Sequence, residues 1–471
     1  MKKLGIIISI LSITVISLLA INHLIPENKY NDNREVNLCS SEELEIKLTD
    51  TLLPVRCYKG ILGNTFIYAY INMDGKIVHG NDEWDYAGWF EDNGLAIVST
   101  SNRFNLINKM GQPILDDNFY HIHYLGHNLY FLSTQDFNYI GKYEEESFHI
   151  EPVEYEWIYE FAENLAAVKT IENLIGYIDL NLEIVIEPQY DYHYIISNKY
   201  NYQFVNDQSI LIKDGKYGII NTSNEVITPF IYDQIERNGD YIEFELAGLK
   251  GLMNQNLEII IDAVYLAIGQ ISKDDVVVVS EDLEHYAFLN VTTNQLLTDY
   301  IYYDIANFNL INSYHYFNYD FAISSLDQKT FNLIDKNFQP LFEIGVDSIK
   351  IINQETVVIS KDQAFQIVNL NTKEAIDLTA KDIDVYPTFD LIAAAVEIDP
   401  EGVSVFKLFD LTGTELFPGL LIYDNMEIKI INGKPFLLFT GEINDIVFSS
   451  YITEDINLVW VPNEVKDNQK S

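Results

Sequence analysis

Three histidines have the spacing in this sequence that most resembles a metal site. His121, His123 and His127 form the pattern HxHxxxH. On a β-strand, residues two apart face the same side, so His121 and His123 could share a cation, with His127 arriving from a turn after Gly126. The alternative is three surface-loop histidines, because His193 stands at the corresponding place of another repeat. The three histidines are therefore candidate metal ligands only.

Acidic clusters are the second candidate for chemistry. They could bind calcium or supply the paired carboxylates that cleave a glycosidic bond. However, none has the Asp-x-Asp-x-Asp-Gly pattern of a compact calcium loop, and 71 acidic residues make clusters common by chance. The sequence also lacks GxSxG, HExxH and a phosphate-binding glycine loop. No catalytic residue and no cofactor is predicted. The clusters are Asp82-Glu83-Asp85, Glu91-Asp92 and Glu144-Glu145-Glu146.

Cys39 and Cys57 are the only cysteines of the chain. Two lone cysteines close together in an exported protein are expected to pair. Closing a loop of this size would contribute roughly 3 kcal/mol on the chain-entropy account. A redox or metal site is the alternative, but the CxxC spacing is missing. The prediction is a disulfide that ties an end-cap onto the first repeat.

The N-terminus, residues 1–21, reads as an export segment. Two lysines precede Leu4–Ile21, eighteen uncharged and mostly apolar residues, which is just long enough to cross a bilayer. Leu18 stands where a signal-peptide cleavage site needs a small residue, which favours an uncleaved anchor over a cleaved signal peptide. Either reading exports the rest of the chain. Residues 22–37 are polar and read as a tether.

The charge of the chain restricts its partners. It has 71 acidic against 29 basic residues, a formal charge of −42. Such a surface repels nucleic-acid phosphates and anionic lipid head groups, so neither is expected as a main partner. It would attract cations and basic proteins. The simpler explanation is that the charge keeps a large β protein soluble.

A repeat organises the chain from residue 68 to residue 417. Each unit is aligned on an Asn or Asp that opens a turn, with Gly141 in that place once, and the intervals range from 33 residues (Asn221 to Asn254) to 45 (Asn290 to Asp335). The residue before the turn is apolar in all ten units, and the residue four before is aromatic in eight. The turn residues are Asn72, Asn108, Gly141, Asp179, Asn221, Asn254, Asn290, Asp335, Asn369 and Asp410.

Each unit reads as a few short antiparallel strands. Apolar runs rich in Ile, Val, Tyr and Phe flank the turn, and turns such as 72–75 fold them into a hairpin. An outlying strand such as 95–98 or 165–168 and a Tyr-Asp run such as Tyr190-Asp191 complete a unit of three or four strands. About 38 residues per unit is the size of a propeller blade. The absence of a sustained 3.6-residue apolar period predicts few helices.

The segment 216–221, Lys-Tyr-Gly-Ile-Ile-Asn, resembles the core of the bacterial WG repeat. Segments 94–98 and 187–191 resemble two further parts of it. The resemblance covers residues 65 to 300 and is faint from 300 to 420. Tyr or Phe replaces the name-giving tryptophan, and the glycine is often Ala or Asn. The resemblance implies an all-β repeat protein, usually exported or surface-associated, and brings no catalytic residues.

The predicted fold is all-β, a tandem array of about ten units of three or four strands. A β-propeller is favoured because closure removes exposed sheet edges, and an open β-solenoid is the alternative. The expected regions are an anchor or signal peptide at 1–21, a tether at 22–37, a Cys-stapled cap at 38–64, the array at 65–460 and a polar tail at 461–471.

The expected function is a non-enzymatic interaction module of the cell envelope, tethered to the membrane outside the cytoplasm. Its partner would be a protein or another envelope component, and a basic partner would suit the acidic surface. The alternative is an exported carbohydrate-active hydrolase on a propeller scaffold, and the third possibility is a structural spacer. Converging carboxylates beside exposed aromatics would favour the hydrolase. The oligomeric state cannot be read from the sequence.

Overall fold

The structure is a computed structural model of the chain. It describes residues 36–37, 47, 50–60, 65–80, 84–196, 202–269, 271–272, 274–305, 321–327, 329–343, 345–398, 404–423, 426–431, 433–443 and 446–459. The N-terminal export segment, the tether and the polar tail lie outside these residues, apart from the short strand at 36–37. Within the described part, no helix is long and apolar enough to span a membrane.

The described fold is all-β, as predicted. Strands pair antiparallel in separate small sheets, mostly of three or four strands, and the helical elements in the described part are a 3-10 helix η1 (Pro387–Phe389) and a single turn at 194–196. The chain divides into two compact units. Unit 1 comprises residues 1–102, 106–113 and 378–471, and unit 2 comprises residues 103–105 and 114–377.

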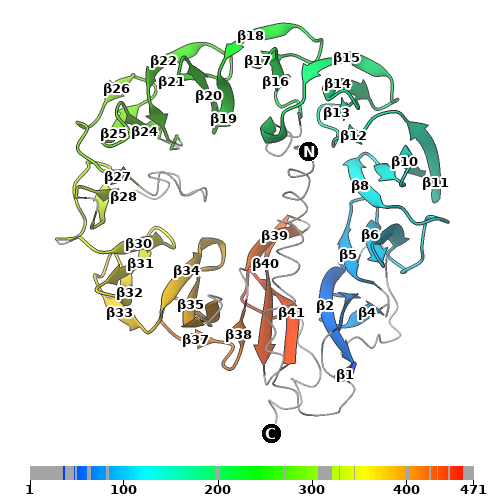
Figure 1. Ribbon diagram of the computed structural model, residues 1–471. Helices are drawn as coiled ribbons and strands as arrows, with labels where there is room; N and C mark the ends of the chain where they lie inside the picture. Colours follow the sequence, from blue (N-terminus) through cyan, green and yellow to red (C-terminus); the bar gives the residue numbers. More distant parts are fainter. Residues whose placement is uncertain are drawn as a thin grey trace, which may run out of the picture. The chain divides into compact units, whose positions relative to one another are not determined.

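The strands of unit 1 come from both ends of the chain (Figure 1). They form the sheet β1-β2-β3-β4, the sheet β5-β6-β7 and an eight-stranded sheet ordered β34-β35-β36-β38-β40-β39, with β37 on β36 and β41 on β40; the first three residues of β7 are counted in unit 2. Their bounds are β1 (Val36–Asn37), β2 (Leu53–Gly60), β3 (Thr65–Ile71), β4 (Ile77–Gly80), β5 (Tyr86–Phe90), β6 (Leu95–Thr100), β7 (Arg103–Asn108), β34 (Asp382–Tyr386), β35 (Leu391–Ile398), β36 (Ser404–Phe409), β37 (Glu415–Leu416), β38 (Leu421–Ile422), β39 (Glu427–Ile431), β40 (Lys434–Ile443) and β41 (Ile446–Thr453).

Unit 2 carries the sheets β11-β10-β9-β8, β12-β13-β14-β15, β16-β17-β18, β19-β20-β21-β22, β23-β24-β25-β26, β27-β28-β29 and β30-β31-β32-β33. Their bounds are β8 (His121–Gly126), β9 (Leu129–Ser133), β10 (Asn138–Glu144), β11 (Ser147–Val153), β12 (Trp157–Ile158), β13 (Leu165–Lys169), β14 (Leu174–Asp179), β15 (Ile184–Asp191), β16 (Ser209–Lys213), β17 (Lys216–Ile220), β18 (Val226–Tyr232), β19 (Gln234–Asn238), β20 (Tyr241–Leu246), β21 (Leu249–Met253), β22 (Ile259–Tyr265), β23 (Ala267–Ile268), β24 (Val276–Ser280), β25 (Ala287–Asn290), β26 (Gln295–Leu296), β27 (Asp304–Ile305), β28 (Phe321–Ser325), β29 (Asn332–Asp335), β30 (Ser348–Ile351), β31 (Thr356–Lys361), β32 (Ala364–Asn369) and β33 (Ala375–Leu378).

The Asn or Asp of each repeat holds its hairpin turn through its side chain. In the third sheet of unit 2, Asn221 Oδ1 accepts hydrogen bonds from the backbone N–H of Ser223 at 3.1 Å and of Glu225 at 2.8 Å. Such local side-chain bonds are the reason that Asn and Asp favour turns. The same pair of bonds, to the residues two and four further on, is made by Asn72, Asn108, Asp179, Asn254, Asp335 and Asp410.

The apolar column before this turn is the buried face of the repeat. Nine of its ten side chains are buried, and Phe409 is half-buried. Because successive strand residues face opposite sides, one such residue per unit fixes the register of its strand. The buried residues are Ile71, Ile107, Ile140, Ile178, Ile220, Met253, Leu289, Ile334 and Val368.

The glycine of the repeat allows two strands to approach closely. Gly218 lies where the register between β17 and β18 shifts, and a Cβ there would lie 2.9 Å from the Thr228 carbonyl oxygen. The equivalent positions are tighter: 2.6 Å from Gly251 to the Ile261 oxygen, and 2.5 Å from Gly176 to the Ile186 oxygen. A bulge that brings backbones together is a common position for glycine.

Three details of the predicted repeat are wrong. Gly141 does not open a turn: it lies inside β10 and packs against Phe148, because the hairpin turn of this unit lies at Glu145 and Glu146. The segments 95–98 and 165–168 are inner strands of their sheets, β6 and β13, and not outlying ones. The Tyr-Asp run ends the preceding strand and is not a fourth strand of its own.

The Tyr-Asp run instead locks a turn. Tyr232 ends β18 with its ring buried, and the Asp233 carboxylate then accepts a hydrogen bond from the backbone N–H of Ala247 at 2.7 Å. Ala247 lies in the turn between β20 and β21. One carboxylate oxygen thus links the start of a sheet to its central hairpin, and the other pairs with Lys216 of the preceding sheet at 2.5 Å.

Candidate functional site

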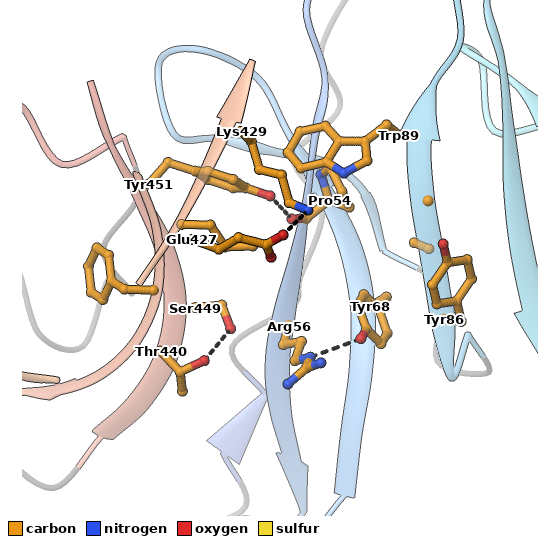
Figure 2. Close-up of a pocket in the computed structure, with 14 residues that line it drawn as sticks. Pro54, Arg56, Tyr68, Tyr86, Trp89, Glu427, Lys429, Thr440, Ser449 and Tyr451 are labelled. Carbon is orange, nitrogen blue, oxygen red and sulfur yellow. Dashed lines mark hydrogen bonds and ion pairs between the residues drawn. The ribbon is translucent and has the colours of Figure 1, made fainter. Parts of the chain in front are cut away.

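A cavity of about 330 Å³ lies within unit 1, where residues from both ends of the chain meet. Figure 2 shows side chains of β2 and β3 facing those of β39, β40 and β41 across it. The lining residues are Pro54, Arg56, Tyr68, Tyr86, Ala87, Gly88, Trp89, Glu427, Lys429, Leu438, Phe439, Thr440, Ser449 and Tyr451. The cavity is at the small end of the range for ligand pockets, roughly 300–1,000 Å³.

The core of unit 1 positions these strands. One hydrophobic cluster joins β2 and β3 to β35, β40 and β41, and β2 lies beside β41 in Figure 1. The buried Tyr451 hydroxyl donates a hydrogen bond to the Pro54 carbonyl oxygen at 2.6 Å. Burial raises the pKa of this hydroxyl well above its usual value, so Tyr451 remains a donor at any physiological pH. The two chain ends are therefore fixed against each other at the cavity wall.

Strand alternation brings pairs of residues into the cavity. Four strands each contribute residues two apart, which lie on the same face of a strand. These pairs are Pro54 and Arg56 on β2, Glu427 and Lys429 on β39, Leu438 and Thr440 on β40, and Ser449 and Tyr451 on β41.

Trp89 lies at an irregularity in β5 and lines the cavity. The pairing of β5 with β6 shifts by one residue between Ala87 and Phe90, so β5 contains one extra residue there. Such a bulge disturbs the regular alternation of the strand, and Ala87, Gly88 and Trp89 all line the cavity here. The Trp89 ring meets the Tyr451 ring edge-on, with centroids 5.7 Å apart. Gly88 lies beside it, and the Tyr70 hydroxyl donates to its carbonyl oxygen at 2.7 Å.

The cavity combines aromatic rings with two cationic groups. Tyr68 and Tyr86 are tilted rings 6.1 Å apart, and Tyr86 is 44% exposed. Arg56 Nε donates a hydrogen bond to the Tyr68 hydroxyl at 2.8 Å. Lys429 and Glu427 form an ion pair at 2.5 Å. The cavity wall therefore offers ring faces, donors and one carboxylate.

A pair of hydroxyl groups completes the polar lining. Thr440 Oγ1 and Ser449 Oγ are 3.3 Å apart on neighbouring strands (Figure 2). Hydroxyls donate and accept, so this pair can bind the hydroxyl groups of a ligand. A small apolar pocket with a few polar groups that converge is the usual form of a ligand site.

The predicted histidine site is brought together only in part. In unit 2 the His121 and His123 rings lie 6.4 Å apart, nearly parallel, and both lie against Trp157. Burial lowers the pKa of both rings, so both are neutral at pH 7. His127 instead meets Phe161 at the turn after β8. Within the described ranges, no three His, Cys, Asp or Glu side chains are grouped to hold a metal ion.

The acidic clusters make local contacts where the structure describes them. Asp85 accepts hydrogen bonds from Ser99 and from the backbone N–H of Asn102, which holds the turn between β6 and β7. Glu144 pairs with Lys142 at 2.6 Å in β10, and the two glutamates that follow it form the hairpin turn. Asp82 and Glu83 lie outside the described residues.

The predicted disulfide also lies outside the described residues. Cys39 is not among them, and for Cys57 the structure describes only the backbone, within β2. Leu53–Gly60 pairs with Thr65–Ile71, so part of the segment interpreted as a cap is a strand of the first sheet.

Most of the cavity residues were missed by the sequence analysis. Tyr68 stood out only as the aromatic residue four places before Asn72 in the first unit, and this aromatic column was expected to belong to the core, not to a site. Arg56 and Lys429 are 373 positions apart, and no local spacing joins them. The only signal was their alternation within strands, two residues apart, which any exposed strand also shows.

The fold is that of an all-β protein built from repeated small antiparallel sheets. A family model described as the WG containing repeat matches residues 150–173, 175–200 and 217–240. The chain therefore contains WG repeats over these three stretches, which include Gly176 and Gly218 at the strand bulges. No curated protein matches the chain.

Solved structures of low similarity also match. A crystal structure of the eukaryotic initiation factor has 8% identity and a TM-score of 0.40, covering 80% of this chain and 97% of its own. BamB from Moraxella catarrhalis has 10% identity and a TM-score of 0.28, covering 70% of this chain and 95% of its own.

Proposed function

We propose that this protein is a binding module without catalytic activity, displayed outside the cytoplasm, and that the cavity of unit 1 is its ligand site. The observation that carries the proposal is the lining of this cavity. Aromatic rings, two cationic side chains and a hydroxyl pair converge there on strands of a fixed core. Sites on rigid strands hold such groups more accurately than sites on loops.

The composition of the cavity favours binding over glycoside cleavage. A glycosidase needs two carboxyl groups facing one bond, one of them acting as an acid. Among the residues that line this cavity, Glu427 is the single carboxylate, and its side chain is 62% exposed and paired with Lys429. The hydrolase alternative therefore has no support at this cavity.

We propose in addition that the sheets are blades of a β-propeller. Sheets of three or four antiparallel strands that follow one another along the chain support this arrangement. The packing of β2 against β41 in the core of unit 1 also supports it, because a propeller brings its first and last blades together.

The proposed location is the cell envelope, with the chain held by Leu4–Ile21. The support is the length of this uncharged run after two lysines. A second partner, a basic protein or envelope component, would be attracted by the formal charge of −42.

The test is binding of fractionated cell-envelope material to the purified full chain, measured by calorimetry and by tryptophan fluorescence. We expect Tyr86→Ala and Trp89→Phe to weaken binding at least tenfold. Ile430→Ala is the matched control, because Ile430 follows Lys429 on β39, is 68% exposed and does not line the cavity. Equal binding by all variants would remove the cavity from the proposal. Chemical conversion of the bound material would overturn the absence of catalysis.

A further inference from the structure

The charge of the cavity is opposite to that of the chain. The sequence has 29 Lys and Arg in 471 residues, yet the cavity is lined by Arg56 and Lys429 with one carboxylate, Glu427. A cationic cavity in an acidic protein indicates a ligand that carries negative charge.

Arg56 is oriented to receive a carboxylate. Its Nε donates to the Tyr68 hydroxyl at 2.8 Å, and its guanidinium carbon lies 5.6 Å from the centre of the Tyr68 ring. Tyr68 in turn is opposite Arg56 in the pairing of β2 with β3. A guanidinium has five N–H donors, so the bond to Tyr68 fixes its direction and uses only one of them. The planar fork of Arg matches a carboxylate in a two-bond arrangement.

Lys429 provides a second positive charge that a ligand can reach. Its side chain is 32% exposed, and its partner Glu427 lies on the same strand, two residues away. Exposed ion pairs of this kind contribute little to stability. A ligand carboxylate can therefore take the place of Glu427 beside Lys429 at small cost, or leave Glu427 free to accept from a ligand hydroxyl.

The rest of the lining suits a sugar ring. Tyr68, Tyr86 and Trp89 offer aromatic faces, whose negative charge density favours the C–H groups of a sugar. Thr440 and Ser449 offer hydroxyls on another wall (Figure 2). A purely aromatic acid would leave these hydroxyls without a ligand partner. The volume of about 330 Å³ is suited to one ring and its substituents.

We infer that the cavity binds an acidic sugar, a single sugar ring with a carboxylate that is held by Arg56 and a ring face that packs on the tyrosines and Trp89, with Lys429 as a second positive charge on the cavity wall. This inference rests on the proposed function and names the ligand class of the same site. The carboxylate determines specificity, and the aromatic rings supply contact that neutral sugars share.

The experiment is calorimetric titration of the full chain with three probes. They are a methyl glycoside of galacturonic acid, the corresponding neutral galactoside, and phenylacetate, which has the carboxylate without the hydroxyls. We expect the uronate to bind at least tenfold more tightly than either of the others. Arg56→Gln should remove this preference, and Arg56→Lys should restore little of it, because the fork is lost while the charge remains.

Controls separate this inference from the proposed function. Lys429→Gln should weaken uronate binding several-fold, whereas Lys434→Gln, an exposed lysine on β40 outside the cavity, should not. Thermal melting of each variant checks that it folds. Equal binding of uronate and galactoside, or of uronate and phenylacetate, would overturn the acidic-sugar inference. The acidic-sugar inference is also overturned if none of the three probes binds while envelope material still binds and Tyr86→Ala weakens that binding. In that outcome the proposed function stands.

Discussion

The close approach of strands at the repeat glycine makes a graded prediction about stability. A Cβ at Gly218 would lie 2.7 Å from two atoms of the Phe230 ring and 2.9 Å from the Thr228 oxygen, both shorter than real contacts of a Cβ. The ring can turn away, but the carbonyl cannot move without disturbing the pairing of β17 with β18. Overpacking of this kind costs about 1–3 kcal/mol, and the lower chain entropy of alanine returns about 0.4–1 kcal/mol. The expected net loss for Gly218→Ala is about 1–2 kcal/mol.

The equivalent glycines should rank by their contacts. At Gly251 the nearest backbone atom is 2.6 Å away, and at Gly176 two backbone atoms, one of Ile186 and one of Pro188, are within 2.6 Å. We expect losses in the order Gly176→Ala, then Gly251→Ala, then Gly218→Ala. Thermal unfolding followed by circular dichroism measures them, at about 2–4 °C per kcal/mol for a unit of this size. If the three variants melt together with the wild type, or above it, the close-approach explanation is wrong.

Three further predictions concern the turn and the column beside it. Ile220→Asp buries a charge at a fully buried position and should cost several kcal/mol, whereas Asp214→Asn, at a turn residue with φ 52°, should change the melting temperature little; equal small shifts would mean that the register is wrong. Asn221→Ala loses the two turn bonds to Oδ1, about 1–2 kcal/mol, while Asn221→Asp keeps this accepting oxygen, loses only the bond from Nδ2 to the exposed Glu225 and should melt closer to the wild type; two equal losses would contradict this. The pKa of Asp335 is lowered chiefly by the hydrogen bond from the Gln339 N–H. The contribution of this carboxylate to stability is therefore complete above its pKa in the unfolded chain, about 3.9, and is lost as pH falls through its lower pKa in the folded chain. Between pH 5 and pH 3 the melting temperature of Asp335→Asn should therefore fall less than that of the wild type, and an equal fall in both proteins would refute this.

The repeat columns were predictable because each is set by a local requirement. Ile220 must be apolar because its side chain lies in the core, and Asn221 must accept bonds from the two N–H groups that follow it. Both requirements act within one hairpin, so they produce the same residue types at a fixed spacing in most units. These columns, with the apolar runs beside them, made the fold class predictable.

Departures from the glycine column have a physical reason that the sequence did not reveal. Asn105 and Asn332 occupy that column in their units. The Asn332 side chain donates to the Phe342 oxygen at 2.9 Å and accepts from the Phe342 N–H at 3.0 Å, and Asn105 makes the same two contacts with Leu115. An amide side chain there replaces the backbone pairing that glycine permits. Asparagine thus links the two strands through its side-chain amide, where glycine lets their backbones approach. Residue type alone does not predict this exchange.

The cavity could not be predicted because it depends on contacts between the chain ends. Arg56 and Lys429 come from strands that are brought together by the core of unit 1, and the bulge beside Trp89 arises from one extra residue in β5. Neither the contact between these strands nor the bulge recurs from one repeat to the next. The scaffold, whose rules recur from unit to unit, was therefore predictable from the sequence, and the candidate site, whose geometry occurs once, was not.

The acidic surface and the cationic cavity can serve different partners because they act over different distances. At physiological salt, charges further apart than about 8 Å are largely screened. A small anion is slowed in its approach by the charge of −42, but in the proposed site it would lie beside the Arg56 guanidinium, and such short-range contacts would determine its residence. A basic macromolecule is instead attracted from a distance and gains mainly in its association rate. Added salt should then speed the association of an acidic sugar and slow that of a basic partner, so the same charge distribution separates the two kinds of ligand by the direction in which salt changes their association rates.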